Sequence, residues 1–295
     1  MKKNKVVNIL VLCIVVLSLF ATTYGIFSKG GPGRHEIKAM NGQTVTIYGE
    51  GLYKNDSVSM AYQGIGQDVA TVLMGIPLLL ISLSISNKGL MKGKLLLTGT
   101  IGYFLYTYTS YSFLSMYNPM FLIYVIIMST SFFAFILMMM SFDMKRIGSY
   151  FDNKLPVKAI GGFLLFLSIA VALMWLKRIL PSIFGGGNGI PIGIEHYTTL
   201  PIQALDLGIV LPTAVLSAVL LMKKRAFGYL LSSILMIKFI TMLTAITAMI
   251  FVQAMAGVKM SLVEVVIFPV FNVLIIYPLY HILRNIKEID LNRRR

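Results

Sequence analysis

Two charged side chains within long apolar runs are the first candidates for chemistry. Lys238 and Glu264 are each flanked by mainly apolar residues. A charge near the centre of a bilayer costs about 2.5–3.5 kcal/mol on insertion scales, so it must face a partner, water or a ligand. Lys238 therefore predicts a polar site within the membrane, although carbonyl groups could hold it as a structural charge or its side chain could snorkel. For Glu264, the alternative is contact with lipid head groups.

Hydroxyl groups follow one face of a neighbouring run. Tyr103, Tyr106, Thr107 and Ser110 are spaced i, i+3, i+4 and i+7, which places them on one side of a helix. In lipid, such groups usually join helices at about 0.6 kcal/mol each, whereas in a cavity they would line a site for a polar or amphipathic ligand. The candidate ligand-binding residues are Lys238, Glu264, Tyr103, Tyr106, Thr107, Ser110, Thr241 and Tyr124.

A second group of candidate site residues is predicted on the outer side, opposite the side that holds most of the basic residues. It comprises Asp68, Asp206, Glu195 and His196. Carboxylates with an imidazole could bind a cation or perform acid/base chemistry on a lipid-linked substrate. The alternative is that Asp68 and Asp206 favour the positive ends of helix dipoles. The spacing matches no metal-binding motif, so we predict no metal site.

The elements that position these residues are expected to be transmembrane helices. A span needs about 20 mainly apolar residues to cross roughly 30 Å of hydrocarbon. We interpret the first run as a retained helix because it is long for a signal peptide and lacks a clear small-x-small cleavage site. The eight predicted spans are 6–27, 68–86, 95–117, 120–141, 159–180, 205–222, 227–254 and 262–283.

Loop charge predicts the orientation of these spans. Of the 26 Lys and Arg residues, 18 fall on the side that holds both termini, seven fall on the opposite side, and Lys238 lies within a span. The positive-inside rule then places both termini in the cytoplasm of a multi-pass cell-membrane protein. The segments 28–67 and 181–204 are the longest outer loops, and the alternating residues 44–49 predict a strand of a hairpin in the first of them.

An internal repeat is predicted from three landmarks in the same order. The stretch 68–73 resembles 206–211, Pro77 and Pro212 are each followed 16 residues later by Gly93 and Gly228, and 120–127 resembles 260–267. The expected fold is all-α, with two parallel four-helix repeats at 1–150 and 151–295. In this register Tyr103 corresponds to Lys238 and Tyr124 to Glu264, so the second half carries charges where the first carries phenols.

Composition excludes several other classes of protein. The chain is 57% hydrophobic and 13% charged, which fits lipid better than water as the solvent. The net charge of +15 comes mainly from clusters beside apolar runs, so we predict membrane lipids as partners and no nucleic acid. The single Cys13, the three dispersed histidines and the lack of a phosphate-loop motif predict no disulfide, haem, nucleotide or other cofactor.

The tyrosine-rich run 102–111, with the stretch 117–124, resembles uncharacterised multi-pass membrane proteins of bacteria. That resemblance implies a membrane location and no activity. From the polar residues we expect a transporter or permease-like subunit for a small polar or amphipathic solute, with another membrane or ATPase subunit as a conceivable partner. The alternatives are a non-catalytic partner or sensor subunit and a membrane-embedded enzyme acting at the outer face.

Overall fold

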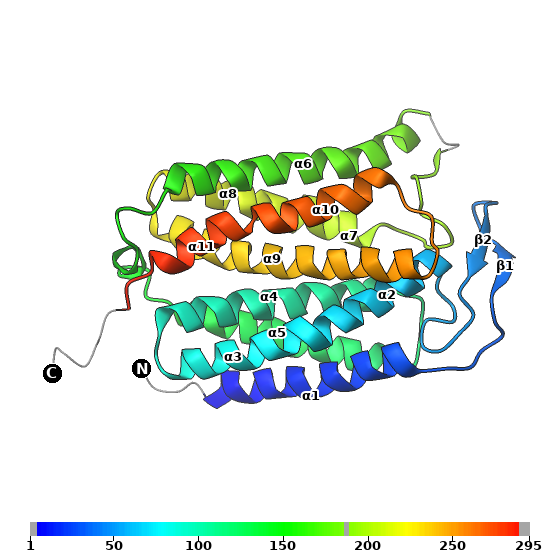
Figure 1. Ribbon diagram of the computed structural model, residues 1–295, viewed down its shortest axis with the longest axis horizontal. Coiled ribbons are helices and arrows are strands. Elements are labelled where there is room, and N and C mark those ends of the chain that lie inside the picture. Colours follow the sequence, from blue (N-terminus) through cyan, green and yellow to red (C-terminus); the bar gives the residue numbers. More distant parts are fainter. Residues whose placement is uncertain (1–4, 186–188, 289–295) are drawn as a thin grey trace.

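The apolar runs of the sequence form long helices that lie side by side in one bundle (Figure 1). The computed structural model describes residues 5–185 and 189–288. The α-helices are α1 Lys5–Phe27, α2 Val58–Ala70, α3 Ile76–Asn87, α4 Met91–Phe113, α5 Phe121–Met140, α6 Val157–Ile183, α7 Pro201–Leu205, α8 Leu211–Met222, α9 Ala226–Met255, α10 Leu262–Leu274 and α11 Ile276–Arg284. The remaining elements are strands β1 His35–Lys38 and β2 Thr44–Ile47, π-helical turns η1 Thr71–Gly75 and η4 Asp206–Val210, and the 3₁₀ turn η2 Ile147–Tyr150.

Within the described part of the chain, seven helices are long and apolar enough to cross a membrane, as expected of an all-α multi-pass membrane protein. These seven begin at Lys5, Val58, Phe121, Val157, Pro201, Ala226 and Val265. The predicted third span is present as α4, but it does not reach the same apolarity because tyrosine, threonine and serine hydroxyls interrupt it. The count of eight spans therefore stays a prediction.

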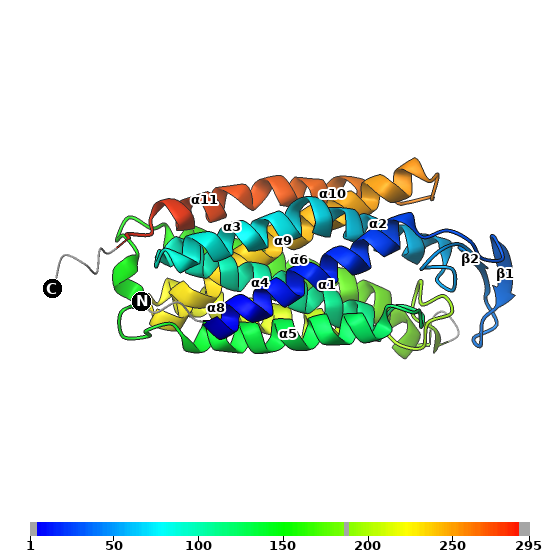
Figure 2. The same cartoon turned by 90° about the horizontal axis from the view of Figure 1, so that it is seen from below.

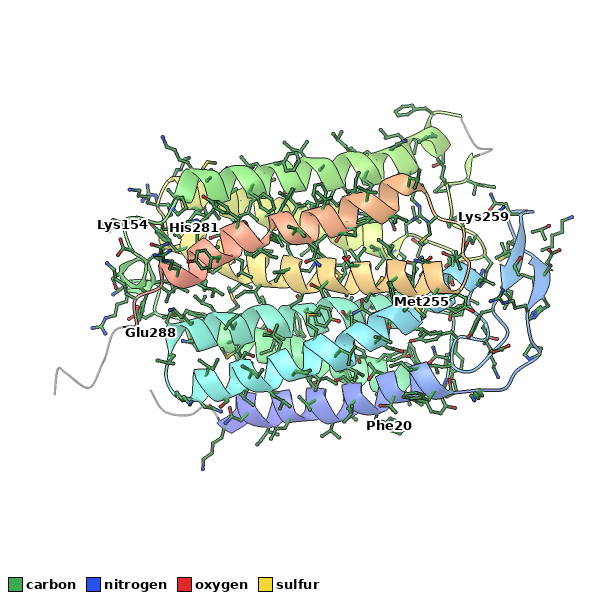
Figure 3. The ribbon with its side chains drawn as sticks, in the orientation of Figure 1. Phe20, Lys154, Met255, Lys259, His281 and Glu288 are labelled. Atoms are coloured by element: carbon green, nitrogen blue, oxygen red, sulfur yellow. The ribbon has the colours of Figure 1, made fainter. Side chains whose placement is uncertain are left out.

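The central position of α4 follows from that composition. It packs against α3, α5 and α9, and most of its side chains are buried. By contrast, α1 exposes large apolar residues, and Phe20 points away from the bundle in Figure 3. Hydroxyl-rich sequence is thus enclosed by protein while apolar sequence faces outward, which is the arrangement that lipid requires.

One end of the bundle, called here the cap end, carries β1, β2 and the loop 189–200 (Figure 1). The two strands form an antiparallel hairpin in which His35 pairs with Ile47, which confirms the strand predicted within 44–49. The loop after α1 is shorter than the predicted segment 28–67, because α2 begins ten residues before Asp68.

The opposite end holds the start of α1 and the end of α11. Figure 3 shows Lys154, His281 and Glu288 there, and Lys259 at the cap end. The Glu288 carboxylate accepts hydrogen bonds from the backbone N–H groups of Met91 at 2.7 Å and Lys92 at 2.9 Å. An anion at the start of a helix satisfies free donors and favours the positive end of its dipole, so this contact ties the end of the chain to α4.

Element boundaries in the two halves share one offset in sequence. Adding 135 to the bounds of η1 gives those of η4, and adding 135 to the bounds of α3 gives those of α8. By the same offset, Met91 at the start of α4 corresponds to Ala226 at the start of α9. Gly93 and Gly228 both abut the backbone of the preceding helix, at Ser86 and Leu221, and these contacts obey the same offset. In this register Asp206 corresponds to Thr71, whereas the sequence comparison had matched it with Asp68.

Edge-on views place α10 and α11 along one margin of the bundle (Figure 2). Pro269 lies inside α10, and the two helices are separated only by Ile275. Pro278 of α11 has no N–H to donate to the Leu274 carbonyl at the end of α10, which favours the break at Ile275. The span that begins at Val265 is also the least enclosed by other helices among the seven, so most of its surface is free to meet lipid.

Close packing of α2 on α9 depends on Gly66. A Cβ added there would lie 2.5 Å from the Met249 Cα, so Gly66→Ala must push the two helices apart. We expect a loss of about 1–3 kcal/mol, measured as a lower thermal unfolding midpoint in detergent. Gly162→Ala in α6 is the matched control, because no atom lies within 4 Å of its added Cβ. Equal midpoints for the two variants would contradict this packing.

Candidate functional site

The hydroxyl groups of α4 divide between two sets of partners. Tyr103 is fully buried, and its hydroxyl accepts a hydrogen bond from Gln67 Nε2 at 2.6 Å and contacts Thr71 Oγ1 at 2.8 Å. The same Gln67 amide donates to Thr107 Oγ1 at 3.2 Å. Tyr103 and Thr107 therefore join α4 to α2 and η1, as expected for polar groups that hold helices together.

Three other predicted residues differ in their hydrogen bonding. Ser110 donates to the Tyr106 carbonyl, and Thr241 donates to carbonyls of its own helix, including Ile237. The buried Tyr124 hydroxyl has no hydrogen-bond partner among the described residues, and its ring packs on that of Tyr111 with centroids 5.0 Å apart. Of the predicted hydroxyl set, Tyr106 is thus the member that meets Lys238.

Asp206 is the centre of a polar site in the second half of the chain. Its Oδ1 accepts a hydrogen bond from the Tyr106 hydroxyl at 2.9 Å, and its Oδ2 accepts one from Trp175 Nε1 at 2.9 Å. The carboxylate begins η4, α4 supplies Tyr106 and α6 supplies Trp175. Turns of π-helix occur frequently at functional sites because they reorient side chains within a long helix.

The two hydrogen bonds to Asp206 fit an ionised carboxylate better than a neutral acid. Indole Nε1–H can only donate, so one carboxyl oxygen must accept from Trp175. The Tyr106 hydroxyl supplies the proton for the other oxygen, and both contacts are then satisfied by an ionised carboxylate. A proton on Asp206 would instead leave the hydrogen of Tyr106 without an acceptor. The geometry therefore fits the anion.

Lys238 lies on the other side of the same tyrosine. Its Nζ is 3.8 Å from the centroid of the Tyr106 ring and 5.5 Å from that of Phe239, and the residue is 7% exposed. A desolvated cation over an aromatic face gains up to about 2 kcal/mol. Among the described residues no carboxylate lies within the 4.0 Å of a salt bridge to Lys238. The carboxylate that interacts with it electrostatically is Asp206, which lies beyond salt-bridge distance on the other side of Tyr106. Glu264 belongs to α10, and its side chain lies outside the described part of the structure.

The four residues predicted as an outer cluster have separate partners. Asp68 is buried against Tyr53 and Tyr111, and Asp206 belongs to the Lys238 site. The Glu195 carbonyl accepts from Asn41 in the hairpin loop, and Glu195 has a positive φ of 56°. His196 Nε2 lies 3.1 Å from the Asn55 carbonyl. Among residues 5–185 and 189–288 no group of three or more His, Cys, Asp or Glu side chains could hold a metal ion.

Sequence reasoning missed Asp56 as an important residue. It is 3% exposed, and its Oδ1 accepts from the Met116 backbone at 3.0 Å and from the Tyr197 hydroxyl at 2.8 Å. It therefore joins three segments of the cap end. Burial raises the pKa of this carboxyl from 3.8 to about 6, while Met116, Tyr197 and His196 act in the opposite direction. The sequence carries only a weak signal, an acidic residue in an outer loop.

A cavity of about 610 Å³ opens at the cap end. Its lining includes Arg34 and Thr44 of the hairpin region, Ser57 at the start of α2, Glu195, and Gly257 after α9. Lys238 and Asp206 are not part of this lining. This cavity is therefore separate from the intramembrane charges.

No family model, curated protein or solved structure matches this chain. The class that the fold defines is a multi-pass helical membrane protein, and the site that distinguishes it is built from Asp206, Tyr106, Trp175 and Lys238.

The single tryptophan gives a direct readout of this site. In Asp206→Ala, the indole N–H of Trp175 loses a charged acceptor, so its NMR resonance should move upfield in uniformly ¹⁵N-labelled protein. The chain has one Trp, so the spectrum contains one indole signal to assign. Asp68→Asn, which changes a carboxyl with other partners, should leave the signal in place. An unchanged resonance in Asp206→Ala would exclude the Trp175–Asp206 bond.

Asp56 should give the cap end a pH-dependent stability. Its pKa is 3.8 when unfolded and about 6 when folded, so the folded state binds more protons between these values. The stabilisation is complete below about pH 4 and is lost as pH rises through about 6, a difference of roughly 3 kcal/mol. Unfolding midpoints from pH 4 to 7.5 measure it, with Asp56→Asn as the reference. Glu195 and His196, which face Asp56, are common to both proteins, and identical pH profiles would refute the assignment.

Proposed function

We propose that this chain is a transporter or permease-like membrane subunit with an intramembrane site for the anionic group of a small polar or amphipathic solute. The observation that carries the proposal is the Lys238 ammonium, which is buried over the Tyr106 ring without a carboxylate within 4.0 Å among the described residues. Ionisable groups within a membrane mark substrate or ion pathways by default. The ligand would supply the anion that Lys238 lacks.

The depth of these residues supports the same site. At 1.5 Å per residue, Lys238 lies about 18 Å from the start of α9, and Tyr106 lies about 22 Å from the start of α4. Asp206 lies about 24 Å from the end of α8 at Met222. All three are measured from the end opposite the cap, so they form a short column with the cation nearest the bilayer centre. An anionic group would approach Lys238, and Asp206 would repel it from the cap side.

The internal repeat is part of the proposal. The shared offset of 135 supports a duplicated four-helix unit in which eight helices, α4 included, cross the membrane and both termini lie inside. In this register the Thr71–Tyr103 contact of the first half corresponds to the Asp206–Lys238 pair of the second. A neutral hydroxyl pair in one half thus corresponds to two charges in the other, as expected if one half is specialised for a ligand.

A non-catalytic partner or sensor subunit is the second candidate. The observation in its favour is that Tyr103, Thr107, Ser110 and Thr241 all have partners inside the bundle, and that the identified cavity lies at the cap end instead of at Lys238. Such a protein would use its polar groups to hold helices together and would bind no solute at Lys238.

A ligand screen tests the proposal and separates it from the second candidate. Purified full-length protein is assayed for thermal stabilisation by a panel of small carboxylates, phosphates and sulfonates. At least one anion should raise the unfolding midpoint of the wild type and fail to do so in Lys238→Met. Lys177→Met is the matched control, because it removes an exposed charge from a different helix and should keep the response.

Uptake of the best hit into proteoliposomes then tests transport. Wild type and Lys177→Met should accumulate the labelled anion, and Lys238→Met should lose at least tenfold in initial rate. If no anion stabilises the wild type, or if Lys238→Met responds equally, the solute site is wrong. A stabilising anion that is not transported would instead support a sensor subunit.

A further inference from the structure

Asp68 is a second buried carboxylate with different surroundings. It is 1% exposed and lies in α2, about 15 Å from the start of that helix and about 28 Å from the end of α3. It is therefore near the cap side of the membrane. Gly25 of α1 closes over its Oδ2, because any side chain at that glycine would overlap the carboxyl group. The carboxyl is thus almost completely enclosed by protein.

Two hydroxyl groups contact this carboxyl group, and one of them also contacts a backbone carbonyl. The Tyr53 hydroxyl donates to Oδ2 at 2.7 Å. The Tyr111 hydroxyl lies 3.0 Å from Oδ1 and also 3.0 Å from the Gly64 carbonyl. Both oxygens next to Tyr111 are acceptors unless Asp68 carries a proton, and Tyr111 has one hydrogen to share between them.

Counting protons distinguishes the two states of Asp68. With an ionised carboxylate, two hydroxyl hydrogens must serve three contacts, and one pair of oxygens is left at 3.0 Å without a proton between them. With a neutral acid, Oδ1–H donates to Tyr111, Tyr111 donates to Gly64, and Tyr53 donates to Oδ2. Each of these three contacts is then a normal hydrogen bond, as expected of buried polar groups, and the two tyrosine hydroxyls lie 3.5 Å apart without a proton of their own.

The electrostatic surroundings favour the same state. The titratable groups that face Asp68 are Tyr53 from the cap loop, Tyr124 from α5, with Asp56 beyond it, and three tyrosines from α4, Tyr103, Tyr108 and Tyr111. None of them is a cation, and no salt bridge within the described residues involves Asp68. An ionised carboxylate that is buried without a cation is strongly disfavoured. Asp206 differs, because it has two committed donors and Lys238 nearby.

We propose that Asp68 is a proton-binding site whose carboxyl group is occupied by a proton at neutral pH and shares it with Tyr111. Asp68 and Asp206 are then opposite in charge state although both start from aspartate. This inference does not rest on the proposed function, since it concerns the other half of the chain and a different ligand, the proton.

Infrared spectroscopy of the full-length protein in lipid tests the proposal. At pH 8 the Asp56 carboxyl, with a pKa of about 6, is ionised and does not contribute. The wild type should show the carbonyl stretch of a protonated carboxylic acid, Asp68→Asn should lose that band, and Asp206→Asn should retain it. A spectrum in which Asp68→Asn removes no such band at pH 8 would overturn the proposal.

The unfolding midpoint provides a second readout that does not depend on the band. An asparagine amide can donate to Tyr111 and accept from Tyr53 in the same way as a neutral acid, so Asp68→Asn should unfold within about 4 °C of the wild type. The unfolding midpoint of Asp206→Asn should fall further, because this variant leaves the Tyr106 hydroxyl hydrogen without an acceptor and removes the anion nearest Lys238. The reverse order would overturn the proposal.

Should Asp68→Asn fail to fold, Tyr53→Phe replaces it in the infrared test. That variant removes the hydrogen bond to Oδ2 and should shift the band of the neutral acid to higher frequency. A band that does not move in Tyr53→Phe would belong to another group and would overturn the assignment to Asp68.

Discussion

The arrangement of this bundle depends on the need to satisfy the polar groups of α4 away from lipid. Four tyrosine or threonine hydroxyls of that helix make contacts with other helical elements, and a helix of this kind cannot face hydrocarbon. The more apolar helices therefore enclose it, with α1 and α10 exposing large aliphatic side chains. Position in the bundle follows hydroxyl content more closely than order in the chain.

The same helix also determines the state of two carboxylates. Tyr111 contributes a hydroxyl to Asp68, and Tyr106 contributes one to Asp206. The second partner of Asp68 is the Tyr53 hydroxyl, and Tyr111 also contacts the Gly64 carbonyl. The second partner of Asp206 is the indole of Trp175, which can only donate. Hydrogen-bond direction thus separates a neutral acid from an anion, and only the anion has a lysine close enough to interact with it.

The cap end is organised by a third carboxylate. Asp56 receives hydrogen bonds from the segments around Met116 and Tyr197, so one buried side chain links three loops that are far apart in sequence. The hairpin adds a contact between Asn41 and Glu195. These links bring loops from both halves of the chain together over the ends of α2 and α9, where the cavity opens.

The sequence by itself determined the class of protein and most helix positions, because runs of about 20 apolar residues have few other solutions. It also identified Lys238 and Tyr106 as polar groups at membrane depth, since a charge among apolar residues stands out without any knowledge of its neighbours. It could not pair Asp206 with Tyr106 and Trp175, which lie 100 and 31 residues away, nor recognise Asp56 as the link between loops. Tertiary structure decided those contacts, and with them which acid keeps its proton, because charge state depends on the donors that packing brings to each oxygen.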